Sequence, residues 1–433
     1  MDPQPIVAPA TPLLPSAVAV LRLSGPDLAA RLAPLVTLPP AREARVRVLR
    51  WEGFQERALV LFFPGPGSYT GEDVVELQVH GNPLLVRRLL DHLGTLGIRL
   101  AEPGEFTRRA LFHGKQGLLE AEALKDLVEA QTDQQLRQAQ ARLGHAPAWL
   151  GKARARLAPW VARAEAAVDY GEEEGLQLDV DNLKAEAMEL VAMFHVEQAR
   201  AAAARWLRDG LRIVLVGRPN AGKSTLFNAL AGEDRAIVTA EPGTTRDVLE
   251  VRAEWRGLPL LLFDTAGLRE AEGEAERLGI ARVQPLLERA DLILHLVPAP
   301  DPGPDPAIQA RLDGLAPKVL EIRTQADRAP GPGLRVSALA GDLDPLERAL
   351  KDRFLGEHAP ESLQGALATA RQLRLLEALA AQVDMVAALD PGAPPELAAS
   401  LLQGAWSLLL RLTGEDRAET ALDELFHGFC LGK

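Results

Sequence analysis

The N-terminal part of the chain alternates short apolar runs with turns. Residues 17–23, 58–63 and 74–79 are rich in Val, Leu and Phe, which favour strands, and Gly- and Pro-rich segments separate them. A run whose apolar residues have helical spacing follows at 84–96. This pattern predicts a small α/β domain over residues 1–116.

A helical pattern replaces these strands from residue 117 onward. Residues 118–143 and 183–208 are rich in Ala, Leu, Gln and Glu, with apolar side chains at helical spacing. We predict one helical domain in two parts, residues 117–208 and 359–433, with another domain inserted between them. The helices of the second part are expected at 362–389, 396–412 and 416–428.

The inserted segment, residues 209–358, alternates strands with helices. Residues 211–217 (LRIVLVG) form a continuous apolar run, as buried parallel strands do. This alternation predicts an α/β domain with a mixed, mostly parallel sheet, and such a guest is tolerated where its two ends lie close together. The further strands are expected at 249–255, 258–264, 291–297, 317–322 and 334–337.

Composition narrows the class of protein. The 433 residues are 47% hydrophobic and 25% charged, as in ordinary folded proteins, and no apolar run approaches the roughly 20 residues of a membrane span. The single cysteine, Cys430, excludes an internal disulfide framework, and the first residues lack the features of a signal peptide. We therefore expect a cytoplasmic protein. A net charge of −12 argues against broad contact with nucleic-acid phosphates, so any RNA contact must be local, shared with a partner or transient.

A phosphate-binding loop is predicted where the strand 211–217 ends. Gly217 to Ser224 read G-R-P-N-A-G-K-S, which fits G-x-x-x-x-G-K-[ST], and a helical pattern follows. In such a loop the backbone amides cradle a phosphate, the lysine reaches the β- and γ-phosphates, and the serine binds Mg²⁺. The strand–loop–helix order argues against a chance Gly-rich turn. The expected nucleotide ligands here are Asn220, Ala221, Gly222, Lys223, Ser224 and Thr225.

Four later elements, taken together with the loop, distinguish a GTP site from an ATP site. Asp264-Thr265-Ala266-Gly267 ends an apolar strand, where the aspartate holds Mg²⁺ through water and the glycine meets the γ-phosphate. Between this motif and the loop lies Gly243-Thr244-Thr245, in which Thr245 is a second candidate Mg²⁺ ligand. Thr324-Gln325-Ala326-Asp327 stands where GTPases have N-K-x-D, with Asp327 reading the guanine edge, and Ser337-Ala338 follows to back the base. The motifs together predict a Ras-like P-loop GTPase domain, a hydrolase acting on GTP.

Two departures from the usual pattern concern affinity and catalysis. Thr324 and Gln325 replace Asn and Lys, and because Gln325 is shorter and uncharged we expect weaker nucleotide binding with guanine specificity retained. Ras-like enzymes place a water-orienting Gln after D-T-A-G, whereas this chain has Leu268. Glu276, in the acidic run 270–276, is the candidate catalytic residue, although such a run is also typical of a solvated face.

G-R-P-N-A-G-K-S together with D-T-A-G-L-R-E resembles the MnmE (TrmE) family of GTPases. Residues 68–81 (SYTGEDVVELQVHG) and 102–114 (EPGEFTRRALFHG) look like that family's N-terminal domain. The terminal LDELFHGFCLGK looks like its F-C-[ILV]-G-K signature. None of these segments is a general GTPase feature, and the resemblance covers almost the whole chain.

The resemblance implies an N-terminal domain that dimerises and binds a 5-formyl- or methylene-tetrahydrofolate. It also implies an FAD-dependent partner of the MnmG/GidA kind. Together the two proteins would add a carboxymethylaminomethyl or aminomethyl group to C5 of the wobble uridine of certain tRNAs, the carbon coming from the folate. GTP hydrolysis would be activated by K⁺ when two GTPase domains meet.

Residue by residue, the family's functional groups fall on definite positions. Mg²⁺ would be held by Ser224 and Thr245, and Glu276 would orient the attacking water. Cys430 would be a possible functional thiol near the folate. The implied K⁺ ligands are Asn220, Thr239, Glu241 and Thr244. The implied folate ligands are Arg22, Glu76, Lys115 and Lys433.

Two other classes of GTPase share the loop motifs. A ribosome-assembly switch of the Era kind should carry a basic RNA-binding appendage, but the C-terminal segment here is helical and acidic. A membrane-remodelling GTPase should carry a basic amphipathic helix, and none is evident.

Overall fold

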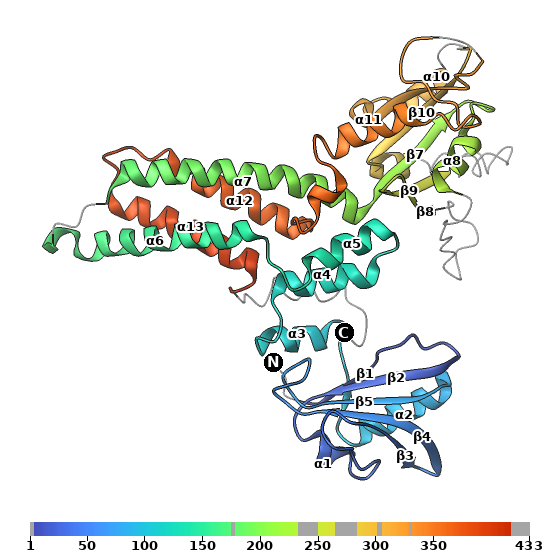
Figure 1. Ribbon diagram of the computed structural model, residues 1–433, viewed down its shortest axis with the longest axis vertical. Coiled ribbons are helices and arrows are strands. Elements are labelled where there is room, and N and C mark those ends of the chain that lie inside the picture. The colour runs from blue at the N-terminus through green and yellow to red at the C-terminus, as the bar shows by residue number, and fades with distance from the viewer. Residues whose placement is uncertain are drawn as a thin grey trace. The chain divides into compact units, whose positions relative to one another are not determined.

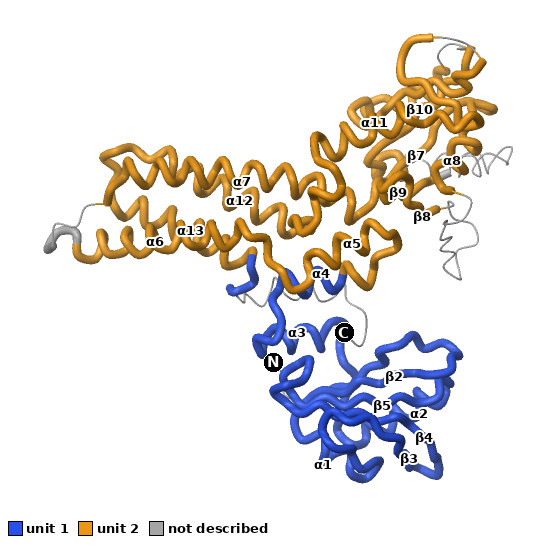
Figure 2. The backbone as a smooth tube through the Cα atoms, in the orientation of Figure 1, with its two compact units in different colours: residues 1–125, 413–433 blue, residues 126–412 orange. Residues whose placement is uncertain are grey.

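The computed structural model describes residues 4–174, 178–232, 250–264, 284–300, 305–328 and 331–416. The chain divides into two compact units (Figure 2). The N-terminal unit comprises residues 1–125 and 413–433, and the second unit comprises residues 126–412. The second unit therefore holds most of the expected helical domain together with the expected insertion.

The N-terminal unit is built on a six-stranded sheet with the order β3-β4-β5-β2-β1-β6 (Figure 1). The β1–β6 pair is parallel and the other pairs are antiparallel. The predicted strands 17–23, 58–63 and 74–79 are confirmed, whereas β1, β3 and β6 were not predicted. The strands are β1 Ile6–Pro9, β2 Ser16–Ser24, β3 Ala44–Trp51, β4 Phe54–Phe63, β5 Val74–Gly81 and β6 Arg99–Leu100.

One face of this sheet is covered by α2. The Asn82 side chain accepts from the Leu84 and Leu85 amides at 2.9 and 3.1 Å, so it satisfies donors that the first helical turn leaves open. Leu89 and Leu93 are fully buried in the core that α2 shares with the sheet. The helices of this unit are α1 Leu28–Leu32, α2 Pro83–Thr95, α3 Glu105–Phe112 and the start of α4 Leu118–Glu129.

A buried arginine fixes the loop between β4 and β5. The fully buried Arg109 of α3 donates to Glu72 at 3.0 Å, to Glu105 at 2.9 Å and to the Gln4 carbonyl at 2.8 Å. Burial alone would raise the pKa of Glu105, but hydrogen bonds from Arg99, the Glu102 amide and Arg109 outweigh it and lower that pKa to about 2. The Glu72 end of the loop is thus tied to α3 by an ion pair that is shielded from water.

Long helices form the larger part of the second unit (Figure 1). The predicted run 118–143 is divided, because Thr132 caps a new helix in a capping box with Gln135. The expected helix 362–389 begins only at Ala370, where Thr369 and Gln372 form a second capping box. The expected helix 416–428 lies outside the described residues. The helices are α5 Asp133–Arg142, α6 Ala148–Glu174, α7 Val180–Asp209, α12 Ala370–Ala387 and α13 Pro395–Thr413, with a 3₁₀ turn at Pro360–Leu363.

The second unit also carries a five-stranded sheet with the order β11-β10-β7-β9-β8. Only β8 and β9 pair antiparallel, so the predicted mixed, mostly parallel sheet is confirmed. The strands are β7 Leu211–Gly217, β8 Glu250–Trp255, β9 Leu258–Asp264, β10 Leu292–Pro298 and β11 Val319–Thr324. The helices beside them are α8 Lys223–Ala231, α10 Pro306–Leu312 and α11 Asp344–Phe354, with a 3₁₀ turn at Ala316–Lys318.

The strand predicted at 334–337 is wrong. That segment makes only isolated bridges, Arg323 to Arg335 and Ser337 to Asp342. The segment still hydrogen-bonds to the chain around the end of β11, from the Arg323 amide to the Leu334 carbonyl at 2.8 Å and from the Ala326 amide to the Val336 carbonyl at 3.2 Å, but it does not become a strand of the sheet.

Strand β8 contacts the start of α5 within the second unit. A Glu254 side-chain oxygen accepts from the Gln134 amide at 2.9 Å, and Arg252 donates to the Gln131 side chain at 3.0 Å. A carboxylate at a helix N-terminus accepts from a backbone amide that has no partner within the helix, and its negative charge interacts favourably with the positive end of the helix dipole. The sheet domain and the helical part are therefore joined by more than the chain connections at the two ends of the inserted segment.

Candidate functional site

The loop after β7 is shaped by close packing and by left-handed residues. A Cβ on Gly217 would lie 2.6 Å from the Leu296 carbonyl oxygen, so only glycine fits where the strand ends. The chain then turns through Asn220 and Gly222, with φ of 60° and 86°, and α8 begins at Lys223. Because a β-carbon disfavours positive φ, the loop must hold Asn220 in place by other contacts.

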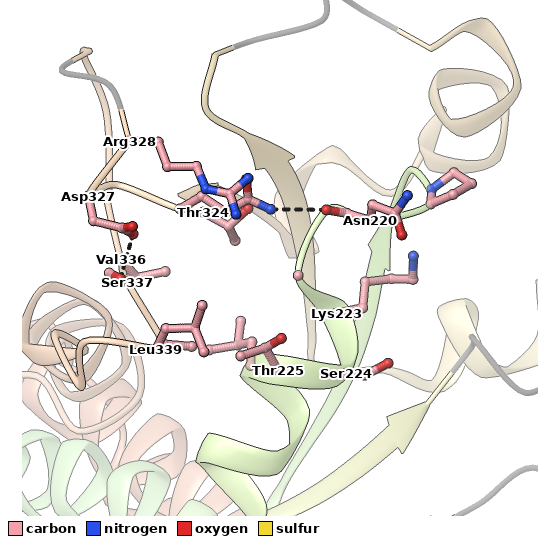
Figure 3. Close-up of a pocket in the computed structure, with 15 residues that line it drawn as sticks. Asn220, Lys223, Ser224, Thr225, Thr324, Asp327, Arg328, Val336, Ser337 and Leu339 are labelled. Atoms are coloured by element: carbon pink, nitrogen blue, oxygen red, sulfur yellow. Dashed lines mark hydrogen bonds between the residues drawn. The ribbon is translucent and has the colours of Figure 1, made fainter.

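Lys223 is buried at the base of this loop. Its ammonium donates to the carbonyls of Gly217 at 3.0 Å and Arg218 at 2.9 Å, and the residue is 8% exposed. The same ammonium lines a cavity between this loop and the segment after β11 (Figure 3). A fixed positive charge at the start of a helix is what a nucleotide phosphate requires.

The segment after β11, here called the base loop (residues 324–328), is tied to the phosphate-binding loop at two points. The buried Thr324 hydroxyl donates to the Ala221 carbonyl at 2.6 Å, and the Gln325 amide donates to the Asn220 carbonyl at 3.0 Å. The residues that replace the usual Asn and Lys thus still connect the two loops. Sequence reasoning missed this, because a threonine hydroxyl reaches the carbonyl only in the folded arrangement.

Asp327 stands ionised at the edge of the cavity. The Ser337 hydroxyl donates to its Oδ1 at 2.7 Å, and this hydrogen bond is the main reason that the pKa of Asp327 is lowered. With Oδ1 held by Ser337, the carboxylate is oriented and can accept N–H groups from a purine edge. Ser337 was predicted to back the guanine base, and in the structure its hydroxyl holds the carboxylate that is predicted to read that base.

The cavity brings most of the predicted nucleotide ligands together. It has a volume of about 670 Å³, in the range of small-ligand sites. Ala221 is fully buried beneath it, and Leu215 pairs with Asp264, which brings the end of β9 to the same edge of the sheet. The predicted residues lining the cavity are Asn220, Gly222, Lys223, Ser224, Thr225, Thr324, Asp327, Ser337 and Ala338.

The remaining predicted residues of this site are not described. The side chain of Asp264 lies outside the described part of the structure, and so do the whole residues Thr239, Glu241, Thr244, Thr245, Thr265, Ala266, Gly267 and Glu276. Of the two Mg²⁺ candidates, Ser224 is exposed to the cavity in the first turn of α8. Among the described residues, no group of three or more His, Cys, Asp or Glu side chains forms a metal cluster. Their helices include none long and apolar enough to cross a membrane.

The chain is similar to known proteins over almost its whole length. A family model described as GTP-binding protein TrmE N-terminus matches residues 5–115, and one described as MnmE helical domain matches residues 118–430. The tRNA modification GTPase MnmE of Methylobacterium radiotolerans is 41% identical, with 99% of both chains covered. The chain belongs to the MnmE (TrmE) family. It is accordingly a GTP hydrolase of the tRNA modification GTPases.

Two further proteins extend the comparison. Human mitochondrial 5-taurinomethyluridine-[tRNA] synthase subunit GTPB3 is 38% identical, with 96% of this chain and 90% of the human chain covered. Among solved structures, the G domain of the T. maritima FeoB iron transporter is 26% identical over 34% of this chain and 96% of its own. Its TM-score is 0.27.

A second cavity of about 360 Å³ lies in the N-terminal unit of this MnmE-family chain. Arg22 and Glu76, two predicted folate ligands, both line it and form an ion pair at 2.9 Å. Tyr69 forms part of the wall beneath the Arg22 guanidinium, which lies 5.8 Å from the ring centre. Lys115 is exposed and is not among the lining residues, while Lys433 and Cys430 lie outside the described residues.

Proposed function

We propose that this GTPase modifies C5 of the wobble uridine of certain tRNAs, using a folate one-carbon unit and an FAD-dependent partner of the MnmG/GidA kind. The added group would be carboxymethylaminomethyl or aminomethyl. The observation that carries the proposal is the presence of two distinct cavities, one suited to a nucleotide and one suited to a pterin. The names of the relatives support tRNA as substrate, and that of the human relative supports a uridine.

The N-terminal cavity fits the flat, amide-edged ring of a 5-formyl- or methylene-tetrahydrofolate. Two of the three Arg22 guanidinium nitrogens, Nε and one terminal nitrogen, contact Oε1 of Glu76, so Oε2 is the oxygen to which pterin N–H groups would donate. Phe63, Val74 and Leu124 supply apolar walls. When bound, the folate would supply the one-carbon unit, and this chain would bind and orient it.

The nucleotide cavity supports hydrolysis by positioning rather than by covalent chemistry. Lys223 would neutralise the β- and γ-phosphates, and Ser224 and Thr245 would hold Mg²⁺. K⁺ would be held by Asn220, Thr239, Glu241 and Thr244, adding charge where other GTPases use an arginine. Glu276 would orient the attacking water, since Leu268 has no polar side-chain atom.

We further propose a homodimer through the N-terminal sheet. The register places Val46, Leu59, Gln78 and Val20 in one row across β3, β4, β5 and β2, on the face opposite α2. Within that row Val46 is 54% exposed, and Val20 and Leu59 are half-buried. A second copy of the same face would cover the three apolar side chains of this row, Val20, Val46 and Leu59, and a two-fold interface brings the same patch of both copies together.

The net charge of −12 makes it more favourable for tRNA to be shared with the partner protein than held by this chain alone. A cytoplasmic location is also part of the proposal. The expected organisation, an N-terminal domain 1–116, helical parts 117–208 and 359–433 and a GTPase domain 209–358, also remains a proposal.

The C-terminal tail offers the sharpest test of the tRNA function. Cys430 and Lys433 follow the last described helix and belong to neither loop of the nucleotide cavity. We expect a chain that lacks residues 430–433 to retain K⁺-stimulated GTP hydrolysis and to lose wobble-uridine modification, measured by mass spectrometry of tRNA nucleosides in cells that depend on it.

A matched variant, Arg22→Ala, should likewise abolish the modified nucleoside while GTP turnover persists. Normal nucleoside levels in both variants would refute the folate-dependent function. Loss of GTPase activity in the truncated chain would show instead that the tail stabilises the fold.

A further inference from the structure

The base loop lacks the lysine that GTPases place beside the guanine ring, but it carries an arginine three residues later. Gln325 occupies the lysine position, and Arg328 directly follows Asp327. Both residues line the nucleotide cavity.

The backbone places the two side chains together. The Arg328 amide donates to the Gln325 carbonyl at 2.9 Å, so residues 325–328 form a tight turn. Within that turn the Arg328 guanidinium donates to Oε1 of Gln325 at 2.8 Å. In Figure 3 the Arg328 side chain extends from the base loop toward Asn220.

The chemistry of the three groups fixes the direction of the Gln325 amide. A guanidinium only donates, so the end of the amide that faces Arg328 must be the oxygen. The nitrogen must then face the Asn220 carbonyl, which only accepts, and it lies 3.0 Å away. Arg328 therefore selects the one orientation of Gln325 in which the amide links the base loop to the phosphate-binding loop.

We propose that Arg328 and Gln325 together replace the missing lysine of the base loop. Gln325 makes the contact with the phosphate-binding loop, and Arg328, acting as a positioning residue, holds the Gln325 amide and supplies the positive charge at the cavity mouth. This inference rests on the proposed role of the cavity as the guanine-nucleotide site. It accounts for how the chain retains a nucleotide site without the usual lysine.

Two further observations agree with the pair. Asn220 has a left-handed φ of 60°, and its carbonyl is held in that conformation by Gln325. Arg328 also lowers the pKa of Asp327, although less than the Ser337 hydrogen bond does. Arg328 thus affects both Gln325 and Asp327.

The test is a double-mutant cycle read by the dissociation constant of fluorescent GDP on the full chain. Arg328→Ala should weaken GDP binding about tenfold, or about 1.4 kcal/mol, in line with losing one charge-assisted hydrogen bond at an exposed site. In a Gln325→Lys background, where lysine makes the usual contact, the same Arg328→Ala change should cost less than twofold. Arg328→Lys should recover part of the native affinity, because an ammonium can also donate to Oε1.

Arg348→Ala is the matched control, because it removes an equal charge from an exposed position of α11 outside the cavity. It should change GDP affinity less than twofold. The inference would be wrong if Arg328→Ala weakened GDP binding equally in both backgrounds, or did not weaken it in the native background, while the intact protein still bound GDP. Failure of the intact protein to bind GDP would refute the nucleotide site itself.

Discussion

The hydrogen bond between Thr324 and the phosphate-binding loop gives the most closely defined prediction. Thr324→Val keeps the shape of the side chain and removes its hydroxyl. The native hydroxyl donates to the Ala221 carbonyl at 2.6 Å, with Thr324 4% exposed and Ala221 fully buried. Valine therefore leaves a buried carbonyl without this donor.

The expected cost follows from that burial. A net contribution of about 0.5–1.5 kcal/mol is usual for a neutral hydrogen bond, and an unsatisfied buried acceptor costs about 1–3 kcal/mol. A total of about 2 kcal/mol would be divided between the free energy of GDP binding and the stability of the folded chain, because the loop can relax when no nucleotide is bound. GDP affinity should fall up to about thirtyfold, and any cost that does not appear there should lower the thermal midpoint by several degrees.

The assay is fluorescent-GDP binding together with thermal unfolding at saturating GDP. Thr324→Ser, which keeps the hydroxyl, should stay within about threefold of the native affinity. Thr324→Asn restores the usual residue and should bind at least as well as the serine variant. If Thr324→Val matched the native protein in both affinity and thermal midpoint, the hydroxyl would not connect the loops and the reasoning would fail.

Four other features of the molecule give predictions. The pKa of Glu105 is about 2 in the folded chain against an ordinary value of 4.5, so its stabilising effect is complete above about pH 4.5 and is lost as the pH falls toward 2. The urea midpoint should therefore decline over that window, and Glu105→Gln should flatten the decline. Glu254→Ala should cost about 1 kcal/mol of stability, because the Gln134 amide loses its acceptor at the start of α5, and Glu254→Gln should recover much of it in urea unfolding. Glu276→Ala should lower GTP turnover about 10²-fold and leave GDP affinity unchanged. Exchanging K⁺ for Na⁺ should slow GTP turnover by the intact enzyme but not by the Asn220→Ala variant. Equal rates for the intact enzyme in both salts would exclude the K⁺ site.

Strong local patterns allowed much of the fold to be predicted. The strand β7, its Gly-rich loop and α8 combine an apolar run with a motif whose residues have little conformational choice. By contrast, β3 was not predicted, because the prediction followed continuous apolar runs, whereas Arg45, Val46, Arg47 and Val48 alternate polar and apolar side chains. Its pairing with β4 defines the strand in the structure. The long helix α6 contains Pro159, which reads locally as a break although tertiary packing keeps the helix continuous.

The candidate site shows the same division between local and tertiary information. The motif residues around Lys223 and Asp327 were predicted, because their roles depend on residue type and spacing. The contribution of Thr324 was underestimated, since a hydroxyl is a short-range donor whose partner is set by the approach of two loops. The bond from Arg328 to Gln325 was also not foreseen, because it depends on a turn that exists only in the folded base loop.

Nucleotide selection by Asp327 tests the central claim most directly, because it asks whether the described cavity is the guanine site. The intact protein should bind GDP much more tightly than XDP, whose base carries an oxygen in place of the amino group. Asp327→Asn should shift the GDP-to-XDP affinity ratio by about 10²-fold toward XDP, since a mismatched polar contact is costly. An unchanged ratio in Asp327→Asn, with GDP still bound tightly, would contradict the account and place the guanine site elsewhere in the chain.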